Sequence, residues 1–492
     1  RKVEDMSMSE IKEFSPNSLI TRTTNDITQV EMFIGFGLQL LIKAPVTAVW
    51  AITKILNKSW EWSMVTAVAV VVLLVVIGIL TIIVMPKFKI VQKLTDKLNG
   101  VTRENLTGIR VVRAFNAEEY QQEKFQDVNN SLTNLQLFNQ KTMSIMAPVM
   151  YLVMYMLTLV IYFIGAYLIK DALMADKIGL FGDMVVFSSY AMQIIMSFLM
   201  LAMIFMILPR AQVSASRINE VLDTSVSVID GNVETKSEVG TIEFKNVSFK
   251  YPDAEEYVLK NISFKANKGD TVAFIGSTGS GKSTLVNLIV RFYDVTDGEI
   301  LIDGVNIKDY KLEYLYKLIG YVPQRAVLFN GTVNSNISYG EAMEKISDKK
   351  IVEASKVAQA DEFISKMDDG YESHIAQGGT NISGGQKQRI AISRAIAKNP
   401  EIYIFDDSFS ALDYKTDAVL RSELKKYTKD ATSLIVAQRI GTIMNADKII
   451  VLDNGESVGV GTHEELLKSC EVYKQIALSQ LSKEELDNAK TK

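Results

Sequence analysis

The chain has 492 residues, 48% of them hydrophobic, and carries a formal net charge of −4. This length predicts two to four domains, and the mildly acidic balance argues against a nucleic-acid-binding surface. The mean hydropathy of +0.13 is high for a soluble protein and is typical of a chain with membrane-embedded segments. The lone Cys470 cannot form an internal disulfide, which agrees with a reducing cytosol.

The N-terminal region carries no recognisable secretion signal. The chain begins with Arg1 and not with Met, which indicates a fragment or a processed form. The first 26 residues are charged and polar and contain no short apolar core, so a signal peptide is not expected.

Four apolar stretches are long enough to cross a membrane as helices, which takes about 20 residues for roughly 30 Å of hydrocarbon. The second and third contain no charged residue, which disfavours the alternative of buried helices in a soluble core. The stretches are Met32–Ile52, Ser63–Met85, Met143–Ile169 and Met184–Leu208.

The first stretch is interrupted by Lys43, which lies near its middle and is followed by Pro45. A lysine in lipid costs about 3 kcal/mol, so this side chain should face the bundle interior or water. One interpretation is a residue that lines a transport cavity. The other, which we favour, is a lysine that reaches a headgroup or a neighbouring helix.

The charges of the connections predict the orientation of the spans. Residues 86–142 hold nine Lys and Arg, whereas the connections 53–62 and 170–183 hold two lysines each. The positive-inside rule therefore places the long segment and both termini in the cytoplasm.

This cytoplasmic segment contains no proline after Pro86 and predicts two helical arms, each reaching roughly 40 Å below the membrane. Its middle, Gly108–Phe115, includes Val111, Val112 and Phe115. Apolar side chains at an exposed tip are typical of a docking surface, so we expect the tip to contact another domain.

After Leu208 the sequence changes character. Polar helix continues to about Leu222, and residues 223–240 show no apolar periodicity, which predicts a linker. From Thr241 onward, short β-branched runs alternate with helical stretches, as in an α/β domain. We therefore expect a transmembrane domain over 1–222, a linker over 223–240, an α/β domain over 241–480 and a C-terminal tail over 481–492.

A phosphate-binding loop follows the apolar strand Val272–Ile275 and precedes a helix, the context that the G-x-x-x-x-G-K-[ST] motif requires. Its glycines let backbone N–H groups surround phosphate oxygens, and the helix N-terminus favours the same anion. Lys282 should reach the β- and γ-phosphates of ATP, and the Ser283 hydroxyl should bind Mg²⁺. The loop comprises Gly276, Ser277, Thr278, Gly279, Ser280, Gly281, Lys282, Ser283 and Thr284.

A second apolar strand, Ile402–Phe405, ends in Asp406. A carboxylate at a buried strand end suits Mg²⁺, often through water. Such a strand end is a weak signal alone, but downstream of the phosphate loop it predicts the partner metal ligand of an ATP site. The fold class expected for this half is an α/β P-loop nucleotide-binding domain.

Ser383, Gly384, Gly385 and Gln386 precede that strand and resemble the signature of ATP-binding-cassette (ABC) proteins. The resemblance implies that this segment serves the ATP bound to the opposite cassette of a head-to-tail dimer.

Further positions match the ABC pattern in order. Tyr251 resembles the aromatic residue that stacks on adenine, and Gln324 the glutamine that touches Mg²⁺ and senses the membrane domain. Ser410–Asp413 resembles the loop that joins the two sites, which implies a nucleotide-site role for Asp413. A core role for Tyr251 or a loop role for Gln324 is the alternative for each residue alone.

The membrane half resembles the exporter class through Ser18–Asp26 and Glu104–Val112, which match its intracellular segments. That class has six spans per half as an α-helical bundle, so the resemblance implies that the first two spans are absent here. It also implies a multi-pass protein of the cell membrane, in contact with lipid, with the nucleotide-binding domain in the cytoplasm.

Two departures from the family decide the expected mechanism. Asp407 stands where the family has the glutamate that polarises the attacking water, and Gln438 where it has a histidine on the γ-phosphate. Neither His374 nor His463 is placed to substitute. A third departure is Gln377, where exporters commonly have glutamate. The resemblance to heterodimeric bacterial multidrug exporters implies a slow site here and a partner half-transporter whose site this signature completes.

The expected substrate is a small hydrophobic or amphipathic compound. Met192, Met196, Met200 and Met203 lie on one helical face of the last stretch, and methionine adapts to varied apolar ligands. Ordinary helix packing is the favoured alternative for these methionines. A lipid or peptide exporter and a regulatory ATP-binding membrane protein with little turnover remain the alternative functions.

Overall fold

The computed structural model describes residues 1–56, 58–235, 239–340, 342 and 345–480. The chain forms two compact units, one over Ile20–Leu222 and one that combines Arg1–Leu19 with Asp223–Lys492. The expected C-terminal tail, residues 481–492, lies outside the described residues.

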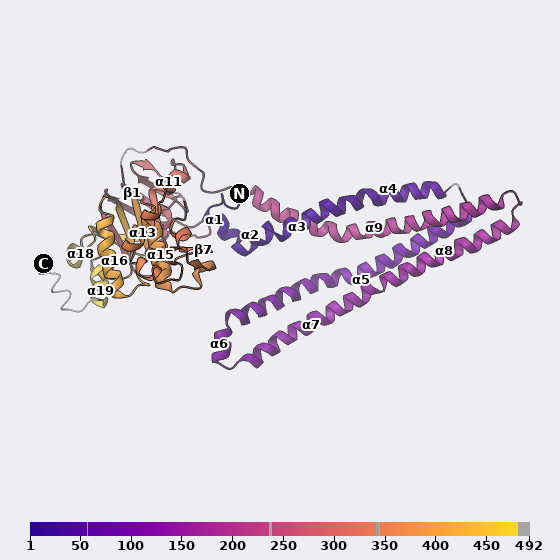
Figure 1. The fold of residues 1–492 in the computed structure, drawn as a ribbon, viewed down its shortest axis with the longest axis horizontal. Coiled ribbons are helices and arrows are strands. Elements are labelled where there is room, and N and C mark those ends of the chain that lie inside the picture. Colours follow the sequence, from indigo (N-terminus) through magenta and orange to yellow (C-terminus); the bar gives the residue numbers. More distant parts are fainter. Residues whose placement is uncertain (57, 236–238, 341, 343–344, 481–492) are drawn as a thin grey trace. The chain divides into compact units, whose positions relative to one another are not determined.

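Long helices form the Ile20–Leu222 unit, which we call the membrane unit (Figure 1). All four predicted apolar stretches lie within helices long and apolar enough to cross a membrane, which confirms the helical bundle. Apart from α6 and α7, which are described below, the helices of this part of the chain are α2 (Pro16–Thr23), α3 (Asn25–Met32), a π-helical turn (Phe33–Gly37), α4 (Leu38–Ile55), α5 (Trp60–Thr107), α8 (Met146–Asp171) and α9 (Lys177–Asp223).

Polar contacts join the spanning helices at a few buried points. The Trp62 indole N–H of α5 donates to the Ile161 carbonyl of α8 at 3.1 Å. Thr47 of α4 and Ser197 of α9 share a hydrogen bond of 2.7 Å between their hydroxyls. In lipid such groups have no water to bond, so pairing them across helices fixes helix neighbours. Lys43 is exposed within this unit.

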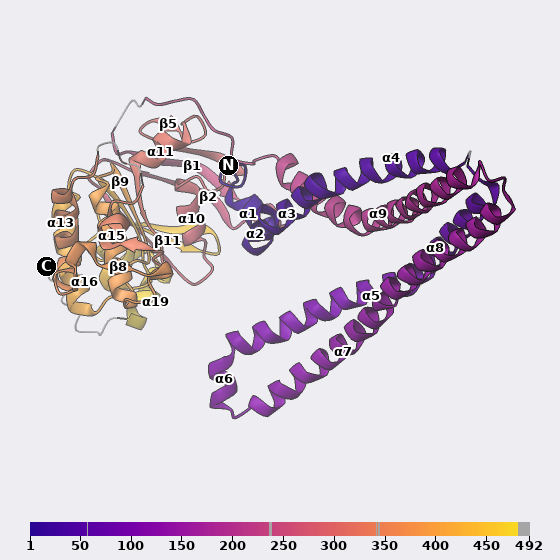
Figure 2. The ribbon, with the colours of Figure 1, turned by 45° about the vertical axis from the view of Figure 1, so that its right-hand side comes forward.

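The cytoplasmic part of the membrane unit is an antiparallel hairpin of α5 and α7 (Glu118–Ser144), with the short α6 (Ile109–Ala114) at its end (Figure 2). The two predicted helical arms are confirmed; docking of the tip on another domain stays a prediction. Val111 and Phe115 are 60% and 78% exposed, but Val112 is 8% exposed. Val112 therefore packs inside the tip, where its carbonyl also accepts the Ala117 N–H, and only its neighbours offer a docking surface.

The second unit, here called the nucleotide unit, is the expected α/β domain. Three sheets form it: an antiparallel sheet of order β2-β1-β4-β5, a sheet of order β12-β11-β3-β10-β9-β6 that is parallel except for β12, and a small antiparallel pair, β7-β8. The strands are β1 (Ile242–Phe249), β2 (Leu259–Ala266), β3 (Thr271–Gly276), β4 (Asp297–Ile302), β5 (Val305–Asn306), β6 (Ile319–Val322), β7 (Gly331–Thr332), β8 (His374–Ile375), β9 (Ile402–Asp406), β10 (Thr432–Val436), β11 (Lys448–Asp453) and β12 (Glu456–Gly461).

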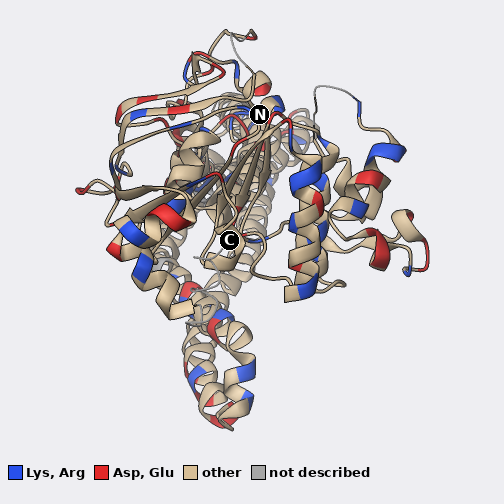
Figure 3. Ribbon diagram, turned by 90° about the vertical axis from the view of Figure 1, so that its left-hand side faces the viewer, with Lys and Arg blue, Asp and Glu red and all other residues tan. Residues whose placement is uncertain are grey.

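Helices cover the parallel strands, which are buried along nearly their whole length, as the runs of Ile, Leu, Val and Phe in β3, β9 and β10 require. Acidic and basic residues alternate along many of the helical ribbons in Figure 3. The helices are α10 (Lys282–Ile289), α11 (Leu312–Leu318), α12 (Val333–Ile337), α13 (Asp348–Val357), α14 (Asp361–Ile364), α15 (Gly384–Ala397), α16 (Tyr414–Tyr427), α17 (Ile440–Ile443), α18 (His463–Ser469) and α19 (Glu471–Gln480).

The N-terminal helix α1 (Met8–Phe14) packs with the nucleotide unit. Glu10 is 5% exposed and accepts hydrogen bonds from the backbone N–H groups of Ser7, at 2.7 Å, and Ser227, at 3.3 Å. Burial raises the pKa of Glu10, but hydrogen bonds from the hydroxyls and backbone N–H groups of Ser7 and Ser227 outweigh it and leave the pKa below its usual value. The charged carboxylate therefore ties α1 to the segment that follows α9.

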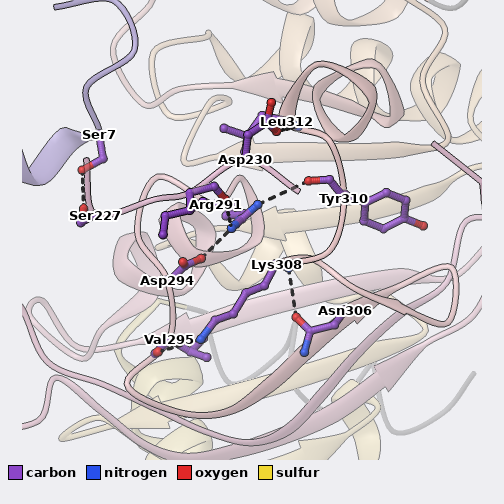
Figure 4. Close-up of polar contacts among 11 residues, drawn as sticks. Ser7, Ser227, Asp230, Arg291, Asp294, Val295, Asn306, Lys308, Tyr310 and Leu312 are labelled. Atoms are coloured by element: carbon purple, nitrogen blue, oxygen red, sulfur yellow. Dashed lines mark hydrogen bonds and ion pairs between the residues drawn. The ribbon is translucent and has the colours of Figure 1, made fainter. Parts of the chain in front are cut away.

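That segment, predicted as a linker, is fastened to the nucleotide unit over residues 227–234, which we call the strap (Figure 4). Backbone N–H groups of Gly231 and Val233 donate to the carbonyls of Tyr310 and Asp309, at 3.1 and 2.9 Å. The Arg291 guanidinium, 2% exposed, donates to the Ile229 carbonyl at 2.8 Å and to Asp294 at 2.9 Å. The strap is thus an ordered edge of the domain.

Candidate nucleotide site

The predicted phosphate loop lies between β3 and α10. Gly279 and Gly281 have φ angles of +85° and +97°, which a side chain would strain. A Cβ at Gly276 would collide with the backbone carbonyl of Leu452 on β11, and one at Gly279 would meet open space. The loop is therefore built close against its own domain on one side and open on the other, as a phosphate cradle requires.

Lys282 begins α10 and folds back over the loop. Its ammonium donates to the carbonyls of Gly276, at 2.9 Å, and Ser277, at 2.7 Å, and to the Ser280 hydroxyl at 3.3 Å. Burial lowers the pKa of Lys282, while the charges of Asp407 and Asp406 oppose that shift. The loop is thus preformed around a cation that can exchange carbonyl contacts for phosphate oxygens.

Strand order brings the remaining predicted residues to the same edge. β3, β10, β9 and β6 are neighbours and parallel, so their carboxyl ends meet beside the loop. Asp406 ends β9 opposite Val436 of β10, and Val322 of β6 lies opposite Phe405. Asp407, Gln438 and Gln324 follow these three strands and come together.

Asp407 is the centre of this group. Its Oδ2 accepts hydrogen bonds from the Gln438 amide at 2.8 Å and from the Gln324 amide at 3.2 Å. Its backbone has a φ of +47°, a left-handed conformation that aspartate tolerates better than most residues. Burial raises the pKa of Asp407, and the hydrogen bonds from Gln324 and Ser410 oppose that shift.

The predicted metal ligands offer oxygen donors of the kind that Mg²⁺ prefers. Asp406 is 6% exposed, and burial together with the neighbouring Asp407 raises its pKa, opposed by a hydrogen bond from Ser283. Over the described residues no three His, Cys, Asp or Glu cluster as a metal cage. A hydroxyl and one carboxylate beside a phosphate cradle fit Mg²⁺, which keeps several waters and takes phosphate oxygens; Gln324 adds a further oxygen.

Tyr251 lies beside the loop, as a base-stacking residue should. Its hydroxyl shares a 3.0 Å hydrogen bond with the Thr284 hydroxyl, and the rings of Tyr251 and Tyr293 pack perpendicular to each other with centroids 5.2 Å apart. The ammonium of Lys12, from α1, lies 5.5 Å from the ring centroid and bonds Asp253 at 3.2 Å. The aromatic ring is therefore held in place on two sides.

The signature segment is not part of this cluster. Ser383 caps α15: its hydroxyl accepts the Gln386 N–H at 3.3 Å, and the Gln386 side chain accepts the Ser383 N–H at 2.9 Å. A Cβ at Gly384 would meet open space, and Gly385 approaches the Ala411 carbonyl. Asp413 likewise caps α16, accepting the Thr416 N–H at 3.0 Å, which lowers the pKa of Asp413.

Two glutamines that the sequence interpretation missed connect to the site. Gln388 of α15, 2% exposed, donates to the Pro323 carbonyl at 3.2 Å, next to Gln324. Gln480 of α19 accepts the Ile440 N–H and donates to the Gln438 carbonyl, both at 2.8 Å. For Gln388, the sequence offered one signal of such a role, a polar residue on an otherwise apolar helix face. The sequence around Gln480 offered no such signal.

Comparisons with known proteins agree with this geometry. The family model for the ABC transporter transmembrane region matches residues 1–198, and that for the ABC transporter domain matches residues 259–410. An uncharacterized ABC transporter ATP-binding protein of Mycobacterium tuberculosis is 40% identical over 96% of this chain and 81% of its own length. The chain is a member of the ABC transporter family.

Other ABC transporters show the same extent of similarity. YfiB of Bacillus subtilis, an uncharacterized ABC transporter ATP-binding protein, is 37% identical over 98% of this chain and 83% of its own. The ATP-dependent lipid A-core flippase of Pseudomonas aeruginosa is 34% identical, with 92% and 74% covered. A bacterial Atm1-family ABC exporter solved with ATP bound matches with a TM-score of 0.82 at 26% identity, over 98% of this chain and 84% of that one.

These similarities establish an exporter-type ABC half-transporter. It is a multi-pass membrane protein whose nucleotide-binding domain is cytoplasmic, and it couples ATP hydrolysis to transport.

Proposed function

We propose that this chain is the half of a heterodimeric ABC exporter whose own ATP site binds ATP and hydrolyses it slowly, while its signature segment completes a competent site on a partner half-transporter. The exported compounds are hydrophobic or amphipathic. The observation that carries the proposal is the 2.8 Å hydrogen bond between Asp407 and Gln438. These two residues stand where the resemblance to the exporters predicts glutamate and histidine.

Both replacements weaken the chemistry at one phosphate. Aspartate is one methylene shorter than glutamate, and misplacing a catalytic group by about 1 Å costs on the order of 100-fold in rate. Glutamine cannot become a cation or carry a proton. His374 bonds Asn330, and His463 bonds Tyr473 in a buried contact, so neither replaces the missing imidazole.

The cofactors of this site are ATP and Mg²⁺, the cation held by Ser283, Asp406 and Gln324. When bound, Mg²⁺ neutralises charge that develops on the phosphate oxygens. Lys282 exchanges its carbonyl contacts for phosphate oxygens, and Tyr251 supports the adenine. The open, correctly capped signature at Gly384 supports a role across the dimer, because its backbone N–H groups are free to approach a partner's phosphate.

The substrate class rests on α9. Met196 and Met203 are each 45% exposed on the face that they share with Met192 and Met200. Such a surface adapts to apolar compounds of varied shape. The relatives named as lipid A-core flippases support a lipid as one form of amphipathic substrate. Peptide export and a regulatory protein with little turnover remain the alternatives.

Steady-state ATPase activity of the complex with its partner tests the asymmetry. We expect Asp407→Asn to leave most of the turnover and replacement of the partner's catalytic glutamate to abolish it. Equal losses from the two changes would remove the asymmetric assignment.

Transport into inside-out vesicles, with apolar cations, lipids and peptides as a panel, tests the substrate class. Uptake that depends on ATP and is lost with Lys282→Met supports an exporter. If none of these compounds is taken up in an ATP-dependent way, the regulatory alternative would be favoured.

A further inference from the structure

Lys43 is the only Lys, Arg, Asp or Glu in the four apolar stretches. It lies 11 residues after the start of Met32–Ile52 and nine before its end, roughly 16 and 14 Å of helix. A lysine side chain has a four-carbon stem, which is too short to bring the ammonium to the headgroups at either end. The ammonium therefore needs water or an anion at the depth of the bilayer centre.

This charge has no counter-charge within the chain. Lys43 is exposed, and within the part of the chain that the structure describes no hydrogen bond, ion pair or ring contact involves its ammonium. Its backbone carbonyl accepts the Thr47 hydroxyl at 2.8 Å, which holds the helix and leaves the side chain free. Since the other stretches hold no Asp or Glu, the counter-charge has to come from a ligand or from another subunit.

The contact between α4 and α9 places Lys43 beside the methionine face of α9. The two helices run side by side in opposite directions (Figures 1 and 2), and the bond between the Thr47 and Ser197 hydroxyls sets their register. Lys43 lies one turn from Thr47 toward the cytoplasm, and Met200 lies about one turn from Ser197 in the same direction. Lys43 and Met200 are therefore at the same depth.

One side of this helix pair packs against the bundle and the other is open. Ala51 of α4 and Ile194 of α9 belong to the core that both helices share with α5 and α8. At 3.6 residues per turn, Lys43 and the methionines fall on the side away from that core, which we call the open side. The residues of the open side are Gln39 and Lys43 of α4 and Gln193, Met196, Met200 and Met203 of α9.

The groups of the open side suit an amphiphile with a negatively charged head. Methionine is unbranched and polarizable, so its side chains adapt to an acyl chain. The Lys43 ammonium offers three hydrogens and a positive charge, and a charged acceptor such as a phosphate forms the stronger hydrogen bonds with it. The exposed amides of Gln39 and Gln193 lie on either side of Lys43 in depth and can donate to further oxygens.

We propose that Lys43 is a specificity-determining residue of the transport path, which binds the anionic head of a lipid-like amphiphile while Met196, Met200 and Met203 contact its apolar body. The head of the substrate supplies the counter-charge that the chain lacks. This inference rests on the proposed function, because it narrows the amphipathic substrate to one with an anionic head.

Binding of three matched probes to the complex with its partner, in phosphatidylcholine nanodiscs without nucleotide, tests the assignment. The probes share one fluorescent acyl chain and carry a phosphate, a hydroxyl or a trimethylammonium head. Lys43→Met removes the charge and should weaken binding of the phosphate probe roughly 10- to 100-fold, the effect of a lost bond to a charged acceptor. It should change binding of the hydroxyl probe less than about threefold, because the apolar contacts remain.

Other variants separate the charge from the apolar wall. Lys43→Arg should keep the preference for phosphate, and Lys43→Glu should reverse it in favour of trimethylammonium. Met200→Gln should weaken all three probes alike, by about 5- to 10-fold. Lys54→Met is the matched control, because Lys54 lies in the last turn of the same helix with its ammonium 4.8 Å from the Trp50 ring centroid, and it should change none of the affinities.

Two outcomes would overturn the assignment. The first is equal affinity of the wild type for the three probes, or binding of none of them. The second is that Lys43 pairs with a carboxylate of the partner: Lys43→Met would then weaken all three probes alike and reduce the assembled complex in size-exclusion chromatography.

The nucleotide-free assay is independent of which site hydrolyses ATP. Vesicle uptake of apolar cations, but not of the phosphate probe, would leave the export function intact and overturn the anion assignment. Selective binding of the phosphate probe without ATP-dependent uptake of any compound would support the anion site and contradict the export function.

Discussion

Replacing Arg291 with methionine removes the buried cation that joins the strap to the nucleotide unit. Methionine fills most of the side-chain volume, so the change removes mainly the charge and its hydrogen bonds. The guanidinium donates at 2.8 Å to the Ile229 carbonyl of the strap and at 2.9 Å to Asp294, which belongs to the domain. Only the first of these bonds breaks when the strap detaches.

The expected loss is therefore that of the single bond between Arg291 and the strap. A hydrogen bond from a charged donor contributes about 1.5–3 kcal/mol, which corresponds to roughly 10- to 150-fold in the equilibrium for strap opening. The unpaired Asp294 destabilises the attached and detached states alike and lowers the stability of the whole domain. Lys311→Met is the matched control: Lys311 bonds Glu234 of the strap at 2.8 Å, but the pair is 42% and 56% exposed. Such a surface pair contributes at most about 1 kcal/mol, or about fivefold.

Hydrogen exchange of the purified complex, resolved by mass spectrometry, measures both changes. The amides of Gly231, Asn232 and Val233 all donate to the domain and report strap opening, and β3 provides a core reference. Arg291→Met should raise exchange in the strap 10-fold or more above any rise in β3, by the estimate above. Equal rises for Arg291→Met and Lys311→Met would refute the argument that burial of the cation decides the strength of the attachment.

Three further predictions concern the site, the pH dependence and the membrane unit. Gly276→Ala should weaken nucleotide binding more than Gly279→Ala. The new Cβ at position 276 collides with a backbone carbonyl of β11, whereas the one at position 279 meets open space and adds only backbone strain of about 1–2 kcal/mol. Titration with a fluorescent ATP analogue measures the affinity of both variants. Burial lowers the pKa of His463 below its usual 6.5, so the folded domain favours neutral histidine and loses stability as the pH falls below that value. The melting temperature of His463→Asn should therefore depend less on pH between about 5 and 7, and an unchanged pH profile would contradict this. Thr47→Val removes the hydrogen bond to Ser197 and should cost about 0.6 kcal/mol in detergent unfolding; a cost above about 2 kcal/mol would mean that the bond does more than join α4 to α9.

The elements and chemistry that local patterns encode were predicted well. The four apolar stretches, the helical arms and the strand–loop–helix around Lys282 each depend on residues close together in the sequence. The prediction that Val112 is part of an exposed surface was wrong. Val112 lies on the buried face of the six-residue helix α6, and the run of apolar residues at the tip does not show which of them face inward. The strap was predicted as a linker because its contacts are made by backbone groups and by single polar side chains, which leave no periodic pattern in the sequence.

The sequence by itself predicted an ATP site, because the phosphate loop and Asp406 are short motifs whose chemistry is local, and its resemblance to ABC exporters predicted the transporter half. It also marked Asp407 and Gln438 as departures from the exporter pattern. Only the tertiary structure decided that Asp407 accepts hydrogen bonds from both Gln438 and Gln324, and that Gln480 contacts the loop at Gln438 and Ile440. Those contacts depend on β6, β9 and β10 ending side by side, and strand order is set by packing across the whole domain.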